Sequence, residues 1–206
     1  MARAPRRRRE TMQGMSVDAR IRGDVRVRAL RAASSLLQRF GADHLSMRLI
    51  ASEAGIGISS IYYYFPGKEQ LLVQLALGGF DALDRVLAGS TTEVASDRGA
   101  FAQAADAFLG FVSANPSLYE LMCDQHLLTQ HAALRSAEDT VSATFGAKVA
   151  EDARFPPQIA ASIAVTFWAL GRGVAATALS HPNRELDTAY LRTLGEGLGY
   201  LIDRRL

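Results

Sequence analysis

The sequence predicts an all-α protein in which a three-helix N-terminal unit with a helix-turn-helix precedes a larger helical domain. Apolar side chains recur at helical spacing along almost all of the 206 residues, and no segment shows the alternation of a half-buried strand. Residues 1–68 hold thirteen basic and five acidic side chains (net +8), whereas residues 69–206 hold ten and sixteen (net −6). This polarity is expected when only the head of a protein meets a polyanion.

The composition excludes several classes of protein. Apolar residues make up 49% of the chain and charged residues 21%, which indicates a folded globular protein. A single cysteine, Cys123, excludes an intramolecular disulfide and suits a reducing cytoplasm. The N-terminus lacks the apolar core of a secretory signal. The most apolar stretch, residues 159–179, is interrupted by Gly171, Arg172 and Gly173, so we expect a buried or dimer-interface helix rather than a membrane span.

The predicted elements begin with a disordered basic arm over residues 1–20, which have no apolar period. Its run Arg6–Arg9 either contacts a DNA groove or phosphates or has no binding role, and Met15 is a second possible start. Asp24 can cap the first helix, and Gly41 ends it. Its apolar face holds Val25, Leu30, Ala33, Leu36, Leu37 and Phe40.

Two short helices follow in the N-terminal domain, which we place at residues 21–68. Ser46 caps one that Gly55 stops, and the other runs from about Ser59 to Tyr64. A longer helix begins near Lys68 and continues toward residue 87, with a glycine pair at 78–79 that can bend it.

Further helices make up the second domain, residues 69–206. One is capped by Asp97 and ended by Asn115, and the next begins at Pro116. The remaining three are expected at about residues 130–153, 158–179 and 185–205, with prolines between them. In the first of these, Leu134, Val141, Phe145 and Val149 face inward.

Residues 46–72 carry the most informative pattern in the chain. Two short helices joined at Ala54–Gly55–Ile56 fit a helix-turn-helix, because glycine permits the turn and Ile56 can fill the core between the helices. We expect Leu49, Ile50, Ala54, Ile61 and Phe65 to hold the unit against the first helix. The second short helix is then free to enter a major groove.

This segment resembles the DNA-binding domain of the TetR-type (TetR/AcrR) repressor family. The resemblance spans about residues 22–72 and rests on Ser46, Ile50–Ala51, Ala54–Gly55–Ile56, Ile61–Tyr62–Tyr63–Tyr64–Phe65 and Lys68–Glu69–Gln70–Leu71. It implies that Tyr62 and Lys68 bind phosphate, that Ser46 is a capping hydroxyl against phosphate, and that Arg48 reaches phosphate or a base. Tyr64 would lie near the sugar-phosphate backbone. The groove-facing positions would be Ile58, Ser59, Ser60 and Tyr63.

Two positions depart from the family pattern. Gly57 stands where the family usually has a serine cap, which costs only about 0.3 kcal/mol. Ser59 stands where the family usually has glycine, so a side chain projects toward the DNA. No Asn, Gln or Arg lies between Gly57 and Ser60, so bidentate base readout there is excluded. We therefore expect modest discrimination per half-site, with specificity multiplied by dimerisation.

The second domain resembles the WHG-type ligand domain of the same family, through Ala114–Met122 and through Trp168–Gly173, in which Arg172 replaces the histidine. That resemblance implies a homodimer formed by the last two helices and a pocket for a small, largely apolar effector. Arg172 needs a partner or an anionic ligand, or lies at the dimer surface. The candidate ligand-binding residues are Phe108, Phe111, Tyr119, Met122, Phe145, Phe167, Trp168 and Arg172.

These patterns favour a cytoplasmic, ligand-responsive repressor that binds a palindromic DNA operator as a homodimer. One alternative is a constitutive DNA-binding protein with no effector, which predicts a filled second domain. The other is an enzyme or metal site using Cys123 with Asp124, His126 and His131, but this spacing matches no zinc signature. We expect neither a cofactor nor a metal.

Overall fold

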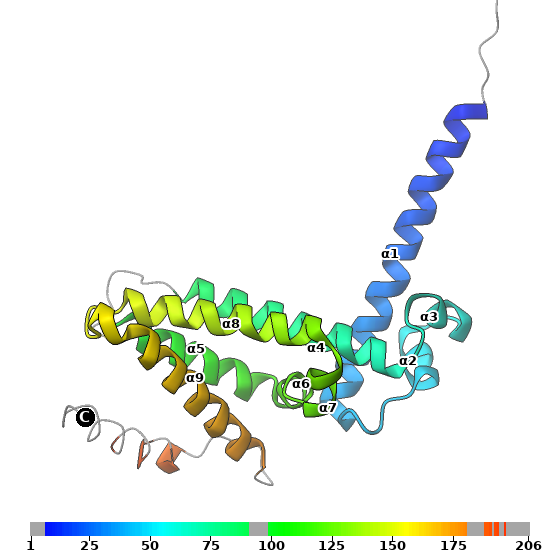
Figure 1. Ribbon diagram of the computed structural model, residues 1–206. Helices are drawn as coiled ribbons and strands as arrows, with labels where there is room; N and C mark the ends of the chain where they lie inside the picture. Colours follow the sequence, from blue (N-terminus) through cyan, green and yellow to red (C-terminus); the bar gives the residue numbers. More distant parts are fainter. Residues whose placement is uncertain (1–6, 91–98, 181–187, 191, 194–195, 197–206) are drawn as a thin grey trace, which may run out of the picture. The chain divides into compact units, whose positions relative to one another are not determined.

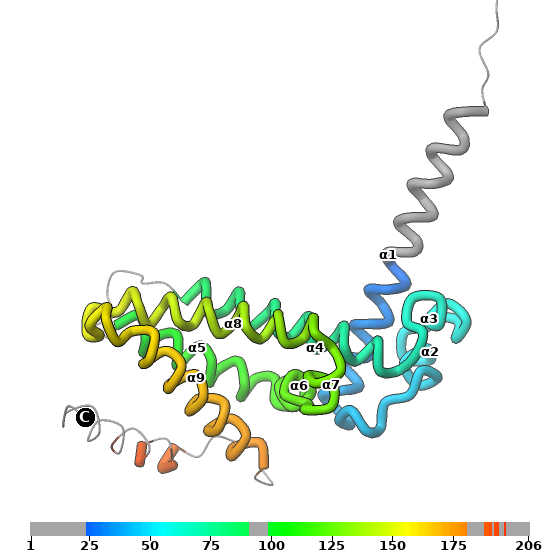
Figure 2. The backbone as a smooth tube through the Cα atoms, in the orientation of Figure 1, coloured from blue at the N-terminus to red at the C-terminus, as the bar shows by residue number. Residues whose placement is uncertain are grey.

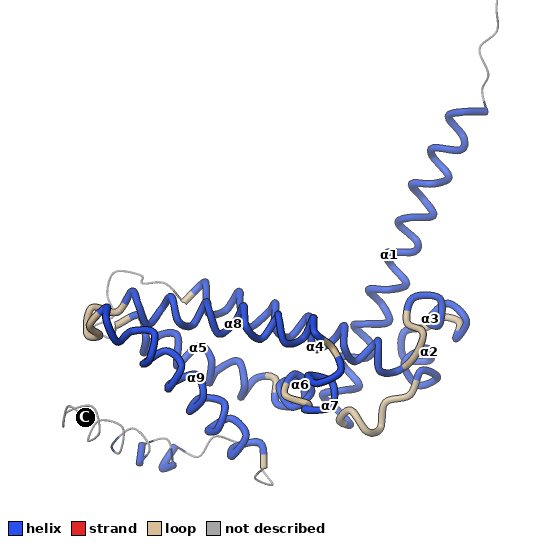
Figure 3. The backbone as a smooth tube through the Cα atoms, in the orientation of Figure 1, coloured by secondary structure: helices blue, strands red, loops and turns tan. Residues whose placement is uncertain are grey.

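The structure, a computed structural model, describes residues 7–90, 99–180, 188–190, 192–193 and 196 (Figures 1 and 2). Within these ranges every regular element is a helix, as predicted (Figure 3). The chain divides into two compact units, Met1–Leu75 and Ala76–Leu206. The boundary between the two units therefore lies after residue 75, whereas the sequence analysis placed it after residue 68. The difference arises because the first turns of α4 belong to the N-terminal unit.

The N-terminal unit contains α1 (Arg7–Phe40), α2 (Met47–Ala54), α3 (Ile58–Tyr64) and the first turns of α4 (Lys68–Gly89). Gly41, with a φ of +76°, and Gly55, with a φ of +61°, follow α1 and α2 in the left-handed conformation. Both glycines therefore end their helices as predicted, since a side chain at this φ would be strained.

The beginning of α1 differs from our expectation. We predicted a disordered arm over residues 1–20 and a cap at Asp24, whereas α1 runs without interruption from Arg7. No proline follows Pro5 in this stretch, and Arg, Glu, Gln, Met and Ala are good helix formers, so the helix continues without an apolar face. Asp24 lies inside α1, with its carboxylate 3.8 Å from the guanidinium of Arg28 one turn later.

The core of the N-terminal unit joins α1, α2 and α3. Its fully buried side chains include Leu36, Leu37, Ile50, Ile61 and Phe65. Leu49, which we expected in this core, is 37% exposed, and Met47 is buried instead. At the start of α2, Met47 rather than Leu49 therefore contributes to the core, together with Ile50 and Ala51.

The second unit continues α4 and adds α5 (Ala100–Ala114), α6 (Pro116–Met122), α7 (Gln125–Gln130), α8 (Ala132–Glu151) and α9 (Pro157–Leu179). The proline that begins α6 and the inward face of α8 (Leu134, Val141, Phe145, Val149) agree with the predictions. The helix expected over about 130–153 is confirmed as α8 to within two residues at each end, but the separate helix α7 that precedes it was not predicted. Asp124 caps α7 by accepting a hydrogen bond from the N–H of Leu127 at 2.9 Å. The predicted Asp97 cap and most of the last helix lie outside the described residues.

Two close contacts tie this unit together. A Cβ at Gly79 would lie 2.6 Å from the Met122 sulfur, so this glycine allows α4 and α6 to approach closely. The carboxylate of Asp152, after α8, accepts a hydrogen bond from the N–H of Phe101 at 3.0 Å and thereby caps the start of α5. It also accepts two hydrogen bonds from the Arg154 guanidinium, at 2.8 and 2.7 Å. These contacts fix the position of Phe101 at the start of α5.

In the part of the chain that the structure describes, α9 is one helix whose length and composition would allow it to cross a membrane. It nevertheless packs against α5, α6 and α8 and carries an ion-paired arginine, Arg172, in its second half. One stripe of its exposed surface holds small or apolar side chains, at Ala161, Val165, Ala169, Gly173 and Ala176, beside the polar Ser162 and Thr166.

Candidate DNA-binding helix-turn-helix and ligand cavity

The first helix of the helix-turn-helix, α2, is closed at both ends. Ser46 adopts an extended backbone and its hydroxyl accepts a hydrogen bond from the N–H of Leu49 at 3.2 Å. At the other end the N–H of Ile56 donates to the Ala51 carbonyl at 3.0 Å, in the wrapped geometry that glycine permits. The capping role expected for Ser46 is therefore confirmed.

Arg28 on α1 locks the turn between α2 and α3, and the sequence analysis missed this role. Its guanidinium donates hydrogen bonds to the carbonyls of Ala54, at 2.6 Å, and Gly55, at 2.9 Å. These are carbonyls at a helix C-terminus that lack partners within the helix, where a cation is also favoured by the helix dipole. The turn is held to α1 by a charged group as well as by the apolar core.

The second helix, α3, is anchored from one side only. Ile61 on α3 and Phe65 immediately after it are buried, with 0% and 1% exposure. Tyr62 and Tyr63 are 50% and 71% exposed, and Ile58 is 37% exposed. Gly57 supplies no side-chain cap, as its residue type dictates. A seven-residue helix thus presents two tyrosines and an isoleucine to the surroundings.

The remaining DNA-binding candidates lie on the surface of the same unit. Ser59, Ser60 and Arg48 are exposed. Tyr64 is half-buried, and its ring meets that of Tyr63 edge to face with centroids 5.0 Å apart. Lys68 is half-buried at the start of α4, and its ammonium lies 3.4 Å from the Asp43 carbonyl. That contact uses one of its three donors and fixes the position of the charge.

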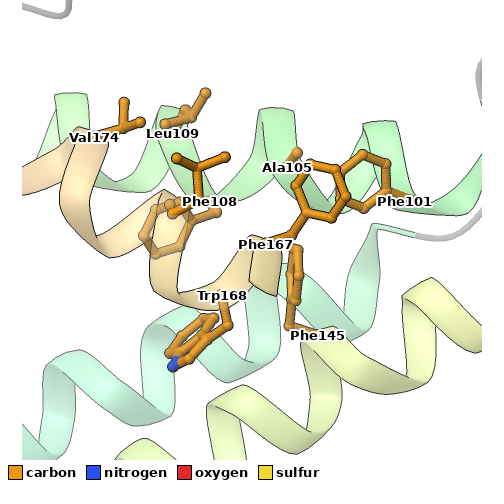
Figure 4. Close-up of a pocket in the computed structure, with 10 residues that line it drawn as sticks. Phe101, Ala105, Phe108, Leu109, Phe145, Phe167, Trp168 and Val174 are labelled. Carbon is orange, nitrogen blue, oxygen red and sulfur yellow. The ribbon is translucent and has the colours of Figure 1, made fainter. Parts of the chain in front are cut away.

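The second unit contains an apolar cavity of about 180 Å³ between α5, α8 and α9 (Figure 4). Four of the predicted ligand-binding residues line it: Phe108, Phe145, Phe167 and Trp168. Sequence reasoning missed the other lining residues, which are Phe101, Ala105, Leu109, Leu170, Gly171 and Val174. Helical spacing was the signal that could have found them, since residues 101, 105 and 108 share one face of α5.

The other ligand candidates lie elsewhere in this unit. Phe111 and Met122 are buried in the core and do not line this cavity. Tyr119 and Arg172 line a second, more polar groove of about 670 Å³ together with Cys123 and Gln125. The structure therefore separates the eight candidates into an apolar aromatic cavity, a polar groove and the core.

An ion pair stands beside the polar groove. The Arg172 guanidinium on α9 is paired with the Glu138 carboxylate on α8, with side chains 33% and 18% exposed. Burial raises the pKa of the neighbouring Tyr119 hydroxyl and also that of the Cys123 thiol. Both groups are therefore neutral at physiological pH, and the thiol is a poor nucleophile. The described residues contain no cluster of three His, Cys, Asp or Glu that could hold a metal ion.

The N-terminal unit presents a helix-turn-helix, an arrangement found in many DNA-binding domains. Residues 29–75 match the family model described as bacterial regulatory proteins, tetR family. The matched residues carry the helix-turn-helix and the start of α4, so this part of the chain is a DNA-binding domain of the tetR type. None of the curated proteins matches the chain.

Solved structures share the fold. A protein of unknown function from Rhodococcus sp. RHA1 is 27% identical, with a TM-score of 0.64, covering 84% of this chain and 94% of that one. A TetR-family transcriptional regulator from Streptomyces coelicolor is 19% identical with a TM-score of 0.62, covering 88% of this chain and 99% of that one. A tetR-family regulatory protein from Rhodococcus RHA1 is 18% identical with a TM-score of 0.56, covering 74% and 83% of the two chains. The similarity therefore extends through the helical body as well as the head.

Proposed function

We propose that this protein is a cytoplasmic, ligand-responsive repressor that binds a palindromic operator as a homodimer and is released by a small, largely apolar effector. The observation that carries the proposal is the one-sided anchoring of α3, which buries Ile61 and leaves Tyr62 and Tyr63 exposed. Exposed aromatic side chains on a short, rigidly seated helix are typical of a surface that meets a partner.

Phosphate contacts would position the head on the duplex. Tyr62 on α3 and Lys68 at the start of α4 present a hydroxyl and an ammonium, and the capped start of α2 brings Ser46 and Arg48 to the surface. Helix N-termini favour the negative charge of phosphates. These contacts fix register but do not read sequence.

Base readout falls to Ile58, Ser59, Ser60 and Tyr63, with Tyr64 near the sugar-phosphate backbone. Ile58 can meet a thymine methyl group, and the two serine hydroxyls accept or donate to several bases. Because none of these side chains makes a bidentate contact, one half-site discriminates weakly and the dimer multiplies the discrimination. Two recognition helices of a dimer read half-sites about 34 Å apart, one turn of the duplex.

Dimerisation is supported by the exposed face of α9. Small and apolar side chains line that face, including Val165, which is 69% exposed. A helix of this kind buries itself against a second copy at little entropic cost. We assign the interface to α9 together with the last helix, at about residues 185–205, which lies outside the described residues for the most part.

The aromatic cavity supports an effector and argues against a constitutive DNA-binding protein, for which a filled body was expected. A cavity between helices closes when a ligand fills it, and the ligand then favours one arrangement of the body. DNA and effector would oppose each other through a coupling free energy of typically about 1–3 kcal/mol. The resemblance of Trp168–Gly173 to the WHG element supports the same assignment.

Selection of bound duplexes from a random pool tests the proposal. We expect an inverted repeat with half-sites one helical turn apart, recovered by wild-type protein at low salt. The matched control is the Tyr62→Ala, Lys68→Ala double variant, which should recover no enriched sequence. Recovery of a single unrepeated site, or of no sequence by the wild type, would contradict the homodimeric operator.

A further inference from the structure

We propose that the aromatic cavity of the body takes an uncharged aromatic ligand of one or two fused rings. The regulatory consequence of such binding rests on the proposed function, whereas the binding itself does not. The inference follows from the chemistry of the cavity wall, from the volume of the cavity, and from the ion pair that Arg172 forms outside it.

The wall offers no charge and almost no hydrogen bond. Its ten residues are Phe101, Ala105, Phe108, Leu109, Phe145, Phe167, Trp168, Leu170, Gly171 and Val174. The indole N–H of Trp168 is their one polar side-chain group (Figure 4). A ligand with a charged or strongly polar group would lose its hydration here without compensation.

Five aromatic side chains surround the space at angles that suit another ring. Phe101 and Phe167 lie with centroids 4.4 Å apart and tilted by 55°. Trp168 contacts Phe108 and Phe145 with centroids 5.7 and 5.8 Å away. Both faces and edges of rings thus border the cavity, and aromatic pairs prefer offset and edge-to-face contacts at these separations.

The volume limits the size of the ligand. The cavity measures about 180 Å³. An engineered apolar cavity of about 150 Å³ in another protein stays dry and binds benzene. The present cavity is slightly larger and partly open, so one ring fits within it and two fused rings fit when the half-buried Phe101 adjusts its position.

Arg172 does not make the cavity a site for anions. It lies four residues after Trp168 on α9, but its guanidinium is already paired with Glu138 and its side chain lines the separate polar groove. A carboxylate in the aromatic cavity would therefore meet no unpaired cation from this arginine. This separation distinguishes an aromatic hydrocarbon or neutral heteroaromatic ligand from an aromatic acid of the same shape.

Trp168 makes the experiment direct, because it is the single tryptophan of the chain and lines the cavity. Its emission would be followed during titration of the full-length protein, without DNA, with naphthalene and separately with 1-naphthoate at neutral pH. We expect saturable quenching or a spectral shift with naphthalene, and binding of 1-naphthoate weaker by about 100-fold. Equal or tighter binding of 1-naphthoate, or no saturable response to naphthalene, would overturn the proposal.

Two variants locate the site. Ala105→Phe fills the cavity and should abolish naphthalene binding, while Ala102→Phe places the same ring at a half-buried position of α5 that does not line the cavity and should leave binding intact. Should Ala105→Phe fail to fold, Phe167→Ala supplies the test by enlarging the cavity. It should admit anthracene, which wild-type protein excludes. Unchanged naphthalene binding in a folded Ala105→Phe, or unchanged exclusion of anthracene in Phe167→Ala, would refute the location.

A parallel measurement of operator release separates this inference from the proposed function. Naphthalene binding without any effect on DNA affinity would support the ligand class and contradict ligand-responsive repression. Release of DNA by a charged ligand that displaces naphthalene from the cavity would support ligand-responsive regulation and overturn the ligand class.

Discussion

Arg172 on α9 and Glu138 on α8 form an ion pair at the edge of the polar groove, with side chains 33% and 18% exposed. The sequence predicted that an arginine on so apolar a helix needs a partner or an anionic ligand, and the structure supplies the partner. Partial burial removes both groups from much of their water, so each depends on the other. The pair also joins two of the three helices that border the aromatic cavity.

Replacing Arg172 by Met should lower the free energy of unfolding by about 1–3 kcal/mol, because Glu138 is left without its cation in a mostly buried position. The double variant Arg172→Met, Glu138→Leu should recover part of this loss, since no unpaired charge remains. Urea unfolding followed by circular dichroism, at one fixed protein concentration, measures both values. A double variant less stable than Arg172→Met would contradict the role of the unpaired carboxylate.

Replacing Arg28 by Ala should destabilise the helix-turn-helix by about 1–2 kcal/mol, because the carbonyls of Ala54 and Gly55 lose a charged donor. Affinity for DNA should fall for specific and non-specific duplexes alike, as the turn that seats α3 loosens. Arg31→Ala is the control, since it removes the same charge from an exposed position of α1. An equal loss of DNA affinity in both variants would mean that charge alone, and not the lock on the turn, is responsible.

Asp152 makes the stability of the body depend on pH below about 4. Its hydrogen bonds from Arg154, together with the N–H of Phe101, hold its pKa at about 2 against partial desolvation. Because this lies below the value of about 3.9 in an unfolded chain, the stabilisation is complete above that value and is lost as the pH falls through about 2. Asp152→Asn lacks this contribution.

Thermal unfolding at pH 6 and pH 3 checks the prediction for Asp152. The difference between wild type and Asp152→Asn should be about 1–2 kcal/mol at pH 6 and roughly half of that at pH 3. Asp139→Asn, at an exposed position of α8, serves as the control and should show no such change. A difference that stays constant, or grows, between pH 6 and pH 3 would rule out titration of Asp152 as its source.

The sequence predicted those parts of the fold that local chemistry determines. Gly41 and Gly55 end helices, Ser46 caps one and Pro116 begins another, because each acts through its own backbone conformation or a hydrogen bond three residues away. The short helix α7 was missed because six residues are too few to show a clear apolar period. Its capping residue, Asp124, was the one local signal for a helix start there. The N-terminal extension of α1 was missed because helix propensity there acts without an apolar face.

Long-range partners could not be predicted in the same way. The hydrogen bonds of Arg28 span 26 and 27 residues, and the ion pair of Arg172 joins it to a carboxylate 34 positions earlier. Neither pairing can be recognised from the spacing of residues that are close together in the sequence. The cavity was predicted only in outline: four of the eight ligand-binding candidates line it, whereas Tyr119 on α6 and Arg172 on α9 line a different groove. For Arg172 the reason is that successive residues of α9 point to different sides of the helix.

Lys68 offers the sharpest test of the proposed phosphate contacts. Its ammonium is held near the Asp43 carbonyl at the start of α4, and a carbonyl group positions the charge without neutralising it. Lys68→Ala should therefore weaken binding to all duplexes by a similar factor and reduce the slope of log K against log salt by about 0.9 for each head of the dimer. The control is Arg85→Ala, which removes an exposed positive charge from the second unit. Lys148 is unsuitable as a control because its side chain is buried. Arg85→Ala should leave the slope unchanged. If Lys68→Ala weakened only some sequences, or left the salt dependence intact, Lys68 would be reading bases or lying away from the DNA, and the docking of α3 would have to be revised.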